Sequence, residues 1–249
     1  MNRLPPLCIL IFVFGICSIT ATADTGTQNA KKACTTPTHR MESGKKNWWQ
    51  ERHEQKNAAA AQGSWELIFI GDSITHGWEK AGKQSWNQYY GKRKALNLGF
   101  GGDRTEHVLW RLDHGELDGY SPKVAVIMIG TNNTGHRKDP PKAIANGVKQ
   151  IIGRLQAKSP ETKILLLAIF PRAASKTDPK RVNNDTTNAL LARLADGDKV
   201  RFLDINDRFL LPDGTLSKEI MPDLLHPQQK GYAIWGEAIE PTLSAMLAD

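Results

Sequence analysis

The fold is decided by residues 67–78, which read LIFIGDSITHGW. The apolar residues 67–70 run directly into a Gly-Asp-Ser tripeptide, and this pattern predicts a buried β-strand that ends in a tight turn. Ligands of parallel α/β folds bind at the carboxyl ends of the strands, so the turn places Ser73 where a functional site is expected. The alternative is that Asp72 and Ser73 only cap the following helix, as these residue types commonly do.

Apolar strand-like segments alternate with amphipathic helical segments along the rest of the chain. The pattern predicts strands over residues 66–70, 95–98, 124–129, 164–170 and 200–203, and helices over 47–61, 85–90, 105–112, 140–158, 183–194 and 228–247. We therefore expect one α/β domain, a three-layer α/β/α sandwich with a flavodoxin-like sheet of five parallel strands. Right-handed crossovers then bring the loops that follow the strands to one edge of the sheet.

The first 23 residues have the features of a signal peptide. Arg3 is positively charged, residues 7–19 are apolar, and residues 21–23 read Ala-Thr-Ala, which fits a cleavage site. The apolar run is short for a membrane span, so no stable membrane span is expected. We predict cleavage after Ala23 and export to the periplasm or the medium.

The next segment differs from the rest of the chain in composition. Residues 24–46 are rich in Thr, Lys, Ala and Gly, so we expect a flexible leader before a domain over residues 47–249. Cys8 and Cys17 leave with the signal peptide, so Cys34 remains as the one cysteine of the mature chain. An intrachain disulfide is therefore not expected.

Charge and motif content exclude several functions. The chain has 33 Lys and Arg against 26 Asp and Glu, a formal net charge of +7, but the basic residues are scattered. Without a basic stripe interleaved with aromatic residues, nucleic acid is not an expected partner. The histidines lack metal-ligand spacing and no cysteine pair is present, so we assign no metal and no cofactor.

Four loops carry polar groups suited to acyl transfer. Ser73 is a candidate nucleophile, His226 a base that would accept its proton, and Asp223 a carboxylate that would orient the imidazole. Gly102 offers a backbone N–H and Asn132 a side-chain amide, two donors for the oxyanion of a tetrahedral intermediate. Taken singly, Asp223 and His226 are more often loop residues, and Asn132 is also a common turn residue.

These residues resemble a known family when they are taken together. They match, in order, the four blocks of the SGNH (GDSL-like) esterases and lipases, namely Gly71-Asp72-Ser73, Gly102, Gly130-x-Asn132 and Asp223-x-x-His226. The resemblance runs from about Trp49 to the end of the chain. Residues 97–103, 107–112 and 115–117 are similar, in particular, to the catalytic subunits of intracellular platelet-activating factor acetylhydrolase.

The resemblance implies an SGNH hydrolase fold and a cofactor-free esterase. It assigns Ser73, His226 and Asp223 as the catalytic triad, with the oxyanion hole formed by Ser73, Gly102 and Asn132. By the same resemblance, a small acyl pocket that favours acetyl would be lined by Ile74, Thr131 and Leu225.

The resemblance leaves the substrate and the assembly open. The resembled subunits pair, so a homodimer is compatible with it. The expected substrate is a small-molecule or carbohydrate acetyl ester. Acetylated phospholipid is an equally open candidate. The alternatives are a longer-chain lipase or thioesterase, and a non-catalytic carbohydrate-binding module. The latter would predict a missing triad member, and none is missing.

Overall fold

The computed structural model describes residues 20–40 and 47–248, and its centre is a five-stranded parallel sheet. The strands are β1 Leu67–Gly71, β2 Ala95–Gly99, β3 Val124–Met128, β4 Lys163–Leu167 and β5 Val200–Leu203. Their order is β2-β1-β3-β4-β5, so the predicted flavodoxin-like topology is confirmed. Because β1 and β3 are neighbours at the centre, the loops that follow them lie side by side.

Helices cover both faces of the sheet. The α-helices are α1 Thr20–Thr35, α2 Trp48–Gln62, α3 Ser73–His76, α4 Lys83–Tyr89, α5 Thr105–Asp113, α6 Pro141–Lys158, α7 Pro179–Leu191 and α8 Gln229–Ala248. Short 3-10 turns occur at Gly77–Glu79 (η1), Ala192–Leu194 (η3) and Asn206–Phe209 (η4), and a π-helical turn at Asn133–Arg137 (η2). Among the described residues, no helix is long and apolar enough to cross a membrane.

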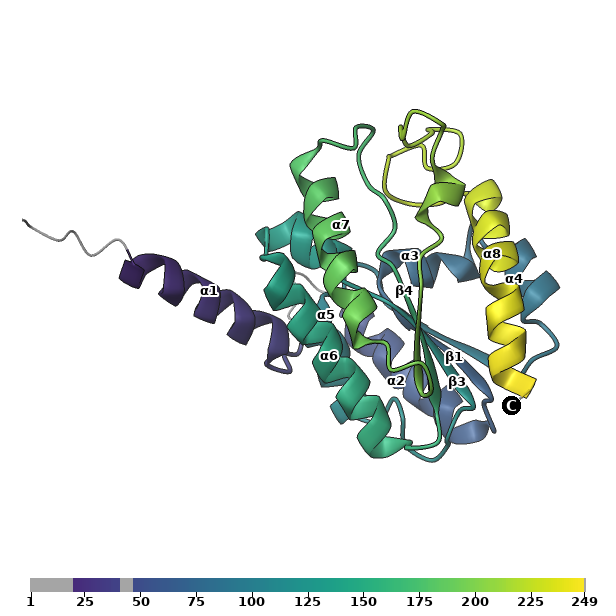
Figure 1. Ribbon diagram of the computed structural model, residues 1–249. Helices are drawn as coiled ribbons and strands as arrows, with labels where there is room; N and C mark the ends of the chain where they lie inside the picture. The colour runs from purple at the N-terminus through teal and green to yellow at the C-terminus, as the bar shows by residue number, and fades with distance from the viewer. Residues whose placement is uncertain (1–19, 41–46, 249) are drawn as a thin grey trace, which may run out of the picture.

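The two faces of the sheet form two separate hydrophobic cores. Ile68 and Ile70 point to the face covered by α2, α5, α6 and α7, whereas Leu67 and Phe69 point to the face covered by α4 and α8 (Figure 1). All four side chains are fully buried. The uninterrupted apolar run of β1 is thus explained by burial on both sides.

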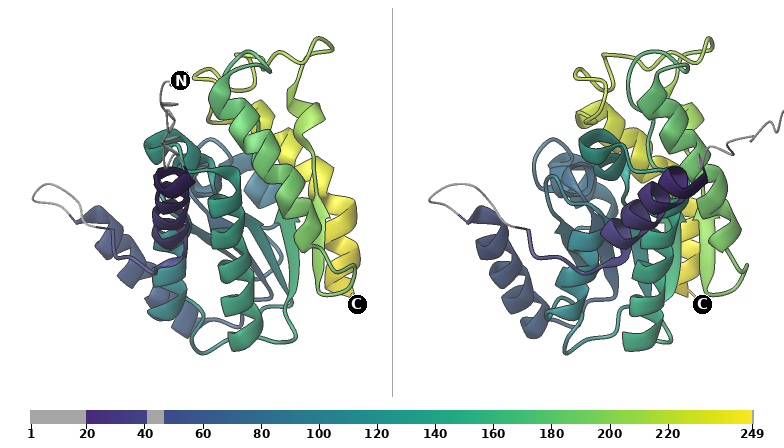
Figure 2. Two further views of the ribbon diagram at one scale, coloured as in Figure 1. Left: turned by 60° about the vertical axis from the view of Figure 1, so that its left-hand side comes forward. Right: turned by 90° about the vertical axis from the view of Figure 1, so that its left-hand side faces the viewer.

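The N-terminal segment departs from the sequence prediction. The prediction of a flexible leader over residues 24–46 is wrong for residues 24–40. Within this range α1 packs across α6 (Figure 2), and Cys34 is fully buried. Gly147 of α6 permits this approach, since a Cβ there would lie 2.7 Å from the Cys34 carbonyl oxygen. Composition suggested little to bury, but the segment is held by a close backbone approach rather than by an apolar face. Residues 41–46, and residues 1–19 of the predicted signal peptide, lie outside the described residues.

The start of α7 was placed too late by the apolar pattern. The helix begins at Pro179 rather than near residue 183, because the Asp178 carboxylate accepts hydrogen bonds from the N–H groups of Lys180 and Arg181. Asp followed by Pro is a helix-start signal in its own right. It lies before the first buried residue of the helix and was therefore missed by periodicity.

Candidate active site

Ser73 lies at the junction of β1 and α3. The Asp72 carboxylate caps α3 by accepting a hydrogen bond from the Ile74 N–H, at 3.0 Å, and Ser73 is the first residue of the helix. A side chain at Gly71 would collide with the Thr75 hydroxyl and the Met128 carbonyl, so the turn requires glycine. The capping interpretation is therefore correct for Asp72, while Ser73 remains partly exposed at the carboxyl end of the sheet.

A chain of hydrogen bonds joins Ser73 to two residues more than a hundred positions away. The Ser73 hydroxyl lies 2.9 Å from Nε2 of His226, and Nδ1 of the same ring lies 2.6 Å from the Asp223 carboxylate. The other carboxylate oxygen of Asp223 accepts from the main-chain N–H groups of Leu225, at 3.0 Å, and His226, at 2.7 Å. One turn thus fixes the carboxylate and the imidazole relative to each other.

The charge of Asp223 is stabilised within this turn. Partial burial acts to raise the pKa of the carboxyl, but the hydrogen bonds from the His226 main chain and ring outweigh it and hold the pKa below its usual value. Asp223 is therefore ionised near neutral pH. An ionised carboxylate accepts a proton-bearing Nδ1, which leaves Nε2 of His226 free to accept a proton from Ser73.

The loop after β2 lies beside Ser73, and a hydrogen bond ties the loop after β3 to it. A Cβ built at Gly101 would lie 4.0 Å from the Ser73 Cβ, and the next residue, Gly102, has a φ of +78° that favours glycine. The Asn132 amide donates to the Asp103 carbonyl at 3.0 Å and so ties the two loops together. Since an amide carries two hydrogens, Asn132 keeps a second N–H for another acceptor.

A buried ionic network supports the loop after β2. The Asp103 carboxylate accepts from Nε of Arg111 at 2.9 Å and from the Trp49 indole at 2.7 Å, and Arg111 also bonds to Glu116. The Arg111 guanidinium lies 3.9 Å from the centroid of the Phe100 ring. Burial raises the pKa of Asp103 to about 6, although Arg111 and Trp49 favour the charged form. The network fixes the backbone on both sides of Gly102.

Sequence reasoning did not find this network. Arg111 lies within the apolar run of the predicted helix over residues 105–112, and both Arg111 and Glu116 are fully buried. A charged residue within an apolar helix face is a signal for a buried ion pair, because an unpaired buried charge is strongly unfavourable.

The three predicted acyl-pocket residues each adjoin a residue of the site in the chain. Ile74 follows Ser73 and is buried in the hydrophobic core on the α4 and α8 face of the sheet. Leu225 precedes His226 and packs against the same core. Thr131 precedes Asn132 and is buried, and its carbonyl and hydroxyl accept hydrogen bonds from Arg172 at 2.8 and 3.1 Å. Their lining of one acyl pocket remains a prediction.

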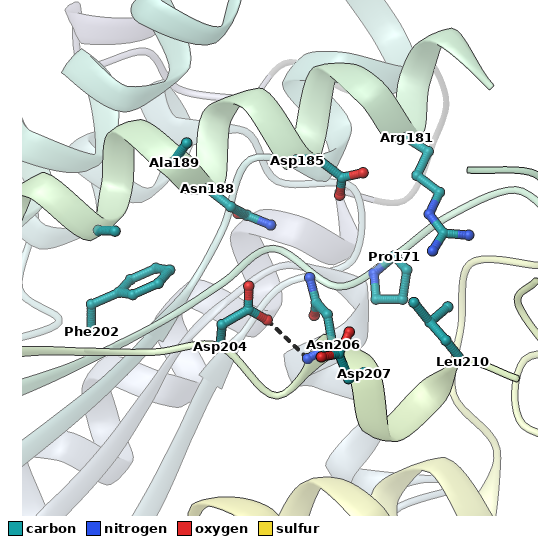
Figure 3. Close-up of a pocket in the computed structure, with 11 residues that line it drawn as sticks. Pro171, Arg181, Asp185, Asn188, Ala189, Phe202, Asp204, Asn206, Asp207 and Leu210 are labelled. Carbon is teal, nitrogen blue, oxygen red and sulfur yellow. Dashed lines mark hydrogen bonds between the residues drawn. The ribbon is translucent and has the colours of Figure 1, made fainter. Parts of the chain in front are cut away.

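A separate cavity of about 420 Å³ lies at the carboxyl ends of β4 and β5 (Figure 3). It is bounded by α7 and η4, and Arg181, Asp185 and Phe202 are among its lining residues. It contains none of the predicted site residues, so it is distinct from the Ser73 site.

Asp72 should make stability depend on pH. Burial raises the pKa of Asp72 to about 7, above its usual value near 4, and one of its carboxylate oxygens has no hydrogen-bond partner. A raised folded-state pKa leaves stability intact below pH 4 and lowers it progressively as pH rises to about 7. Asp72→Asn keeps an acceptor for the cap but cannot ionise. We expect its free energy of unfolding, relative to wild type, to increase by up to about 4 kcal/mol between pH 4 and pH 8.

Urea unfolding at several pH values measures this difference. Asp198→Asn, at an exposed position, serves as the control and should track wild type. A difference between Asp72→Asn and wild type that stays constant with pH would contradict a protonated, buried Asp72.

Comparison with known proteins identifies the family. Residues 69–234 match the GDSL-like lipase/acylhydrolase family. The chain belongs to this family. Platelet-activating factor acetylhydrolase IB subunit alpha1 of Pongo abelii is 35% identical to this GDSL-like acylhydrolase over 201 residues, which cover 80% of this chain and 84% of the relative. Subunit alpha2 of Gallus gallus is 34% identical over 186 residues, with 74% and 79% covered.

Solved structures agree with the fold. A protein from Streptococcus pneumonia described as a platelet activating factor superposes on this GDSL-like acylhydrolase with a TM-score of 0.65 and 25% identity, covering 79% of this chain and 95% of that chain. An acetylxylan esterase from Geobacillus stearothermophilus shares the fold, with a TM-score of 0.57 and 19% identity over 74% of this chain and 95% of its own. Family membership makes the protein a carboxylic ester hydrolase.

Proposed function

We propose that this GDSL-like acylhydrolase is an exported esterase that removes acetyl groups through an acyl-Ser73 intermediate. The observation that carries the proposal is the continuous hydrogen-bond chain from Ser73 through His226 to Asp223. A serine hydroxyl is a weak nucleophile unless a positioned base takes its proton, and this chain supplies the base and the carboxylate that orients it.

The reaction follows from the geometry. Nε2 of His226 accepts the Ser73 proton as Oγ attacks the ester carbonyl, and Asp223 stabilises the resulting imidazolium. The tetrahedral intermediate collapses when His226 returns the proton to the departing alcohol oxygen, which leaves Ser73 acylated. Water then attacks the acyl-enzyme with His226 again as base, and the products are acetic acid and free Ser73.

The oxyanion would be held by three donors from separate loops. These are the main-chain N–H groups of Ser73 and Gly102 and the side-chain amide of Asn132. The Gly102 and Asn132 loops are already tied by the bond from Asn132 to the Asp103 carbonyl. A preorganised donor of this kind is typically worth about 3–4 kcal/mol of transition-state stabilisation.

The acyl group and the cellular location are the remaining parts of the proposal. Ile74, Thr131 and Leu225 each adjoin a site residue and would leave room for a short acyl chain such as acetyl. The relatives are named as acetylhydrolases, in agreement with this acyl group. Export rests on the charged, apolar and Ala-x-Ala regions of residues 1–23. The alcohol part of the ester is a sugar or a phospholipid.

Acetate release by the purified protein tests the proposal. We would offer acetylated xylo-oligosaccharides, an acetylated phospholipid, and p-nitrophenyl acetate, butyrate and octanoate, with Ser73→Ala as the blank. The expected result is Ser73-dependent acetate release from one of the natural classes and a rate that falls with acyl length. A preference for octanoate would contradict the small acyl pocket and favour a longer-chain lipase. Hydrolysis that persists in Ser73→Ala would refute the mechanism.

A further inference from the structure

The N-terminal segment reaches two of the three loops that carry the proposed oxyanion donors, those of Gly102 and Asn132. Residues 34–40, called here the N-terminal strap, precede the matched family region of residues 69–234. The strap leaves the end of α1, crosses α5 and ends beside the Gly102 loop, and Thr38 donates its N–H to the Glu106 carbonyl at 3.1 Å along the way. It is thus attached at several points to the elements that frame the site.

The first end of the strap holds the loop after β3. Asn133, the neighbour of Asn132, donates to Sγ of Cys34 at 3.4 Å and to Asp139 at 3.0 Å. The Cys34 thiol in turn donates to Asp139 at 3.2 Å, and its main-chain carbonyl accepts from Thr105 at 2.9 Å. Asn133, Asp139, Thr105 and Cys34 are all buried. The strap therefore belongs to the buried polar packing directly behind Asn132.

The second end of the strap holds the loop after β2. Nη1 of Arg40 donates a hydrogen bond to the main-chain carbonyl of Gly101, and the guanidinium lies 5.4 Å from the centroid of the Trp48 ring. A Cβ built at Gly102 would lie only 2.7 Å from Nη1 of Arg40. Arg40 is thus packed directly against the glycine pair that adjoins Ser73.

The contact between Arg40 and Gly101 acts on one peptide unit. The carbonyl of Gly101 and the N–H of Gly102 belong to the same planar, trans peptide group and point in opposite directions. Fixing the carbonyl therefore fixes the direction of the N–H. A cationic donor on the carbonyl also polarises the peptide and makes its N–H a stronger donor.

This peptide needs such support because glycine flanks it on both sides. Neither Gly101 nor Gly102 has a Cβ to restrict rotation, and Gly102 already occupies the left-handed region at φ +78°. A Gly-Gly peptide can therefore turn its N–H away from Ser73 unless a partner holds the carbonyl.

We propose that the N-terminal strap is part of the esterase site and that Arg40 is a positioning residue for the oxyanion donor at Gly102. The inference rests on the proposed function. It predicts that the chain outside the matched family region contributes directly to turnover. The strap acts through the Gly101–Gly102 peptide and need not touch the substrate.

Kinetics of Arg40 variants test this role. Arg40→Met removes every donor but keeps an unbranched side chain over Trp48, Arg40→Lys keeps a cationic donor, and Lys32→Met removes a charge from an exposed position on α1. With p-nitrophenyl acetate we expect Arg40→Met to lower kcat by about 10- to 100-fold, approaching the loss of an oxyanion donor, with KM within about 3-fold. Arg40→Lys should recover most of the loss, and Lys32→Met should match wild type.

The acid limb of the rate profile provides a second readout. His226 and Asp223 are unchanged in Arg40→Met, so the pH at which the rate falls should stay where it is in wild type. Unchanged kcat in Arg40→Met would overturn the positioning role. An equal loss in Lys32→Met would also overturn it, since charge rather than the hydrogen bond would then be responsible.

Alkylation of Cys34 measures docking of the strap without reference to activity. Burial, together with the neighbouring Asp139 carboxylate, raises the pKa of the Cys34 thiol to about 12. Iodoacetamide should therefore modify Cys34 at least 100-fold more slowly in native protein than in urea, as located by peptide mass mapping. Equal rates would overturn the docked strap.

The kinetic and labelling results also separate this inference from the proposed function. Absence of any Ser73-dependent turnover would refute the proposed function and the role of Arg40 with it. Normal turnover with no effect of Arg40→Met would refute the role of Arg40 alone.

Discussion

Ser73→Ala should lower kcat for ester hydrolysis by a factor on the order of 10⁵ to 10⁶ while the fold is retained. Without Oγ no acyl-enzyme forms, and only the oxyanion donors and substrate binding remain to accelerate attack by water. Ser73 is the first residue of α3, and the cap is provided by Asp72 rather than by the Ser73 hydroxyl. Alanine at this position therefore removes the nucleophile without removing the cap.

The double variant with His226→Ala provides an internal control. Because nucleophile and base act as one unit, His226→Ala alone should cost about as much as Ser73→Ala, and the double variant should be no slower than either. Far-UV circular dichroism and the melting temperature show whether each variant is folded. Multiplicative losses in the double variant would contradict a mechanism in which His226 serves only to activate Ser73.

Asp223→Asn should lower kcat by about 10³- to 10⁴-fold. One oxygen of Asp223 accepts from the Leu225 and His226 main chain, and asparagine can keep these bonds through its carbonyl oxygen. The amide nitrogen would then face Nδ1 of His226 as a donor. Nδ1 must accept, so the proton moves to Nε2 and the ring can no longer take the Ser73 proton.

Asp213→Asn is the matched control for this variant. Asp213 lies in a neighbouring exposed loop and also accepts a main-chain hydrogen bond, from Thr215 at 2.8 Å, but the described contacts place no histidine on it. It should retain wild-type kcat, as measured with p-nitrophenyl acetate. Full activity in Asp223→Asn would show that the carboxylate does not set the tautomer of His226.

The sequence predicted most of the fold because its strands are buried on both faces. An uninterrupted apolar run such as β3 can hardly be exposed, and alternation with amphipathic helices restricts the topology to a parallel sheet. The positions of Ser73 and Asn132 followed from the same reasoning, since both residues lie in the loops that follow central strands. His226 could be placed only through the four motif blocks, because it does not directly follow one of the five strands of the sheet.

The N-terminal strap could not be predicted from the same patterns. Its composition gives no amphipathic face, and its contacts are made by single residues, such as Cys34 and Arg40, with partners far along the chain. The network of Asp103 and Arg111 was also missed, because hydrophobic periodicity ignores buried ion pairs. Both features depend on specific polar contacts, which hydrophobic patterns do not report.

The turn that carries Asp223 and His226 has a consequence for how this enzyme can diversify. Carboxylate and imidazole share one four-residue unit, and their mutual orientation is set by hydrogen bonds within that unit. Changes in the flanking loops would move the imidazole and the carboxylate together and leave the hydrogen bond between them intact. Natural variation can therefore reshape the substrate entrance around this unit while preserving its chemistry, which makes these loops a favourable place to engineer selectivity.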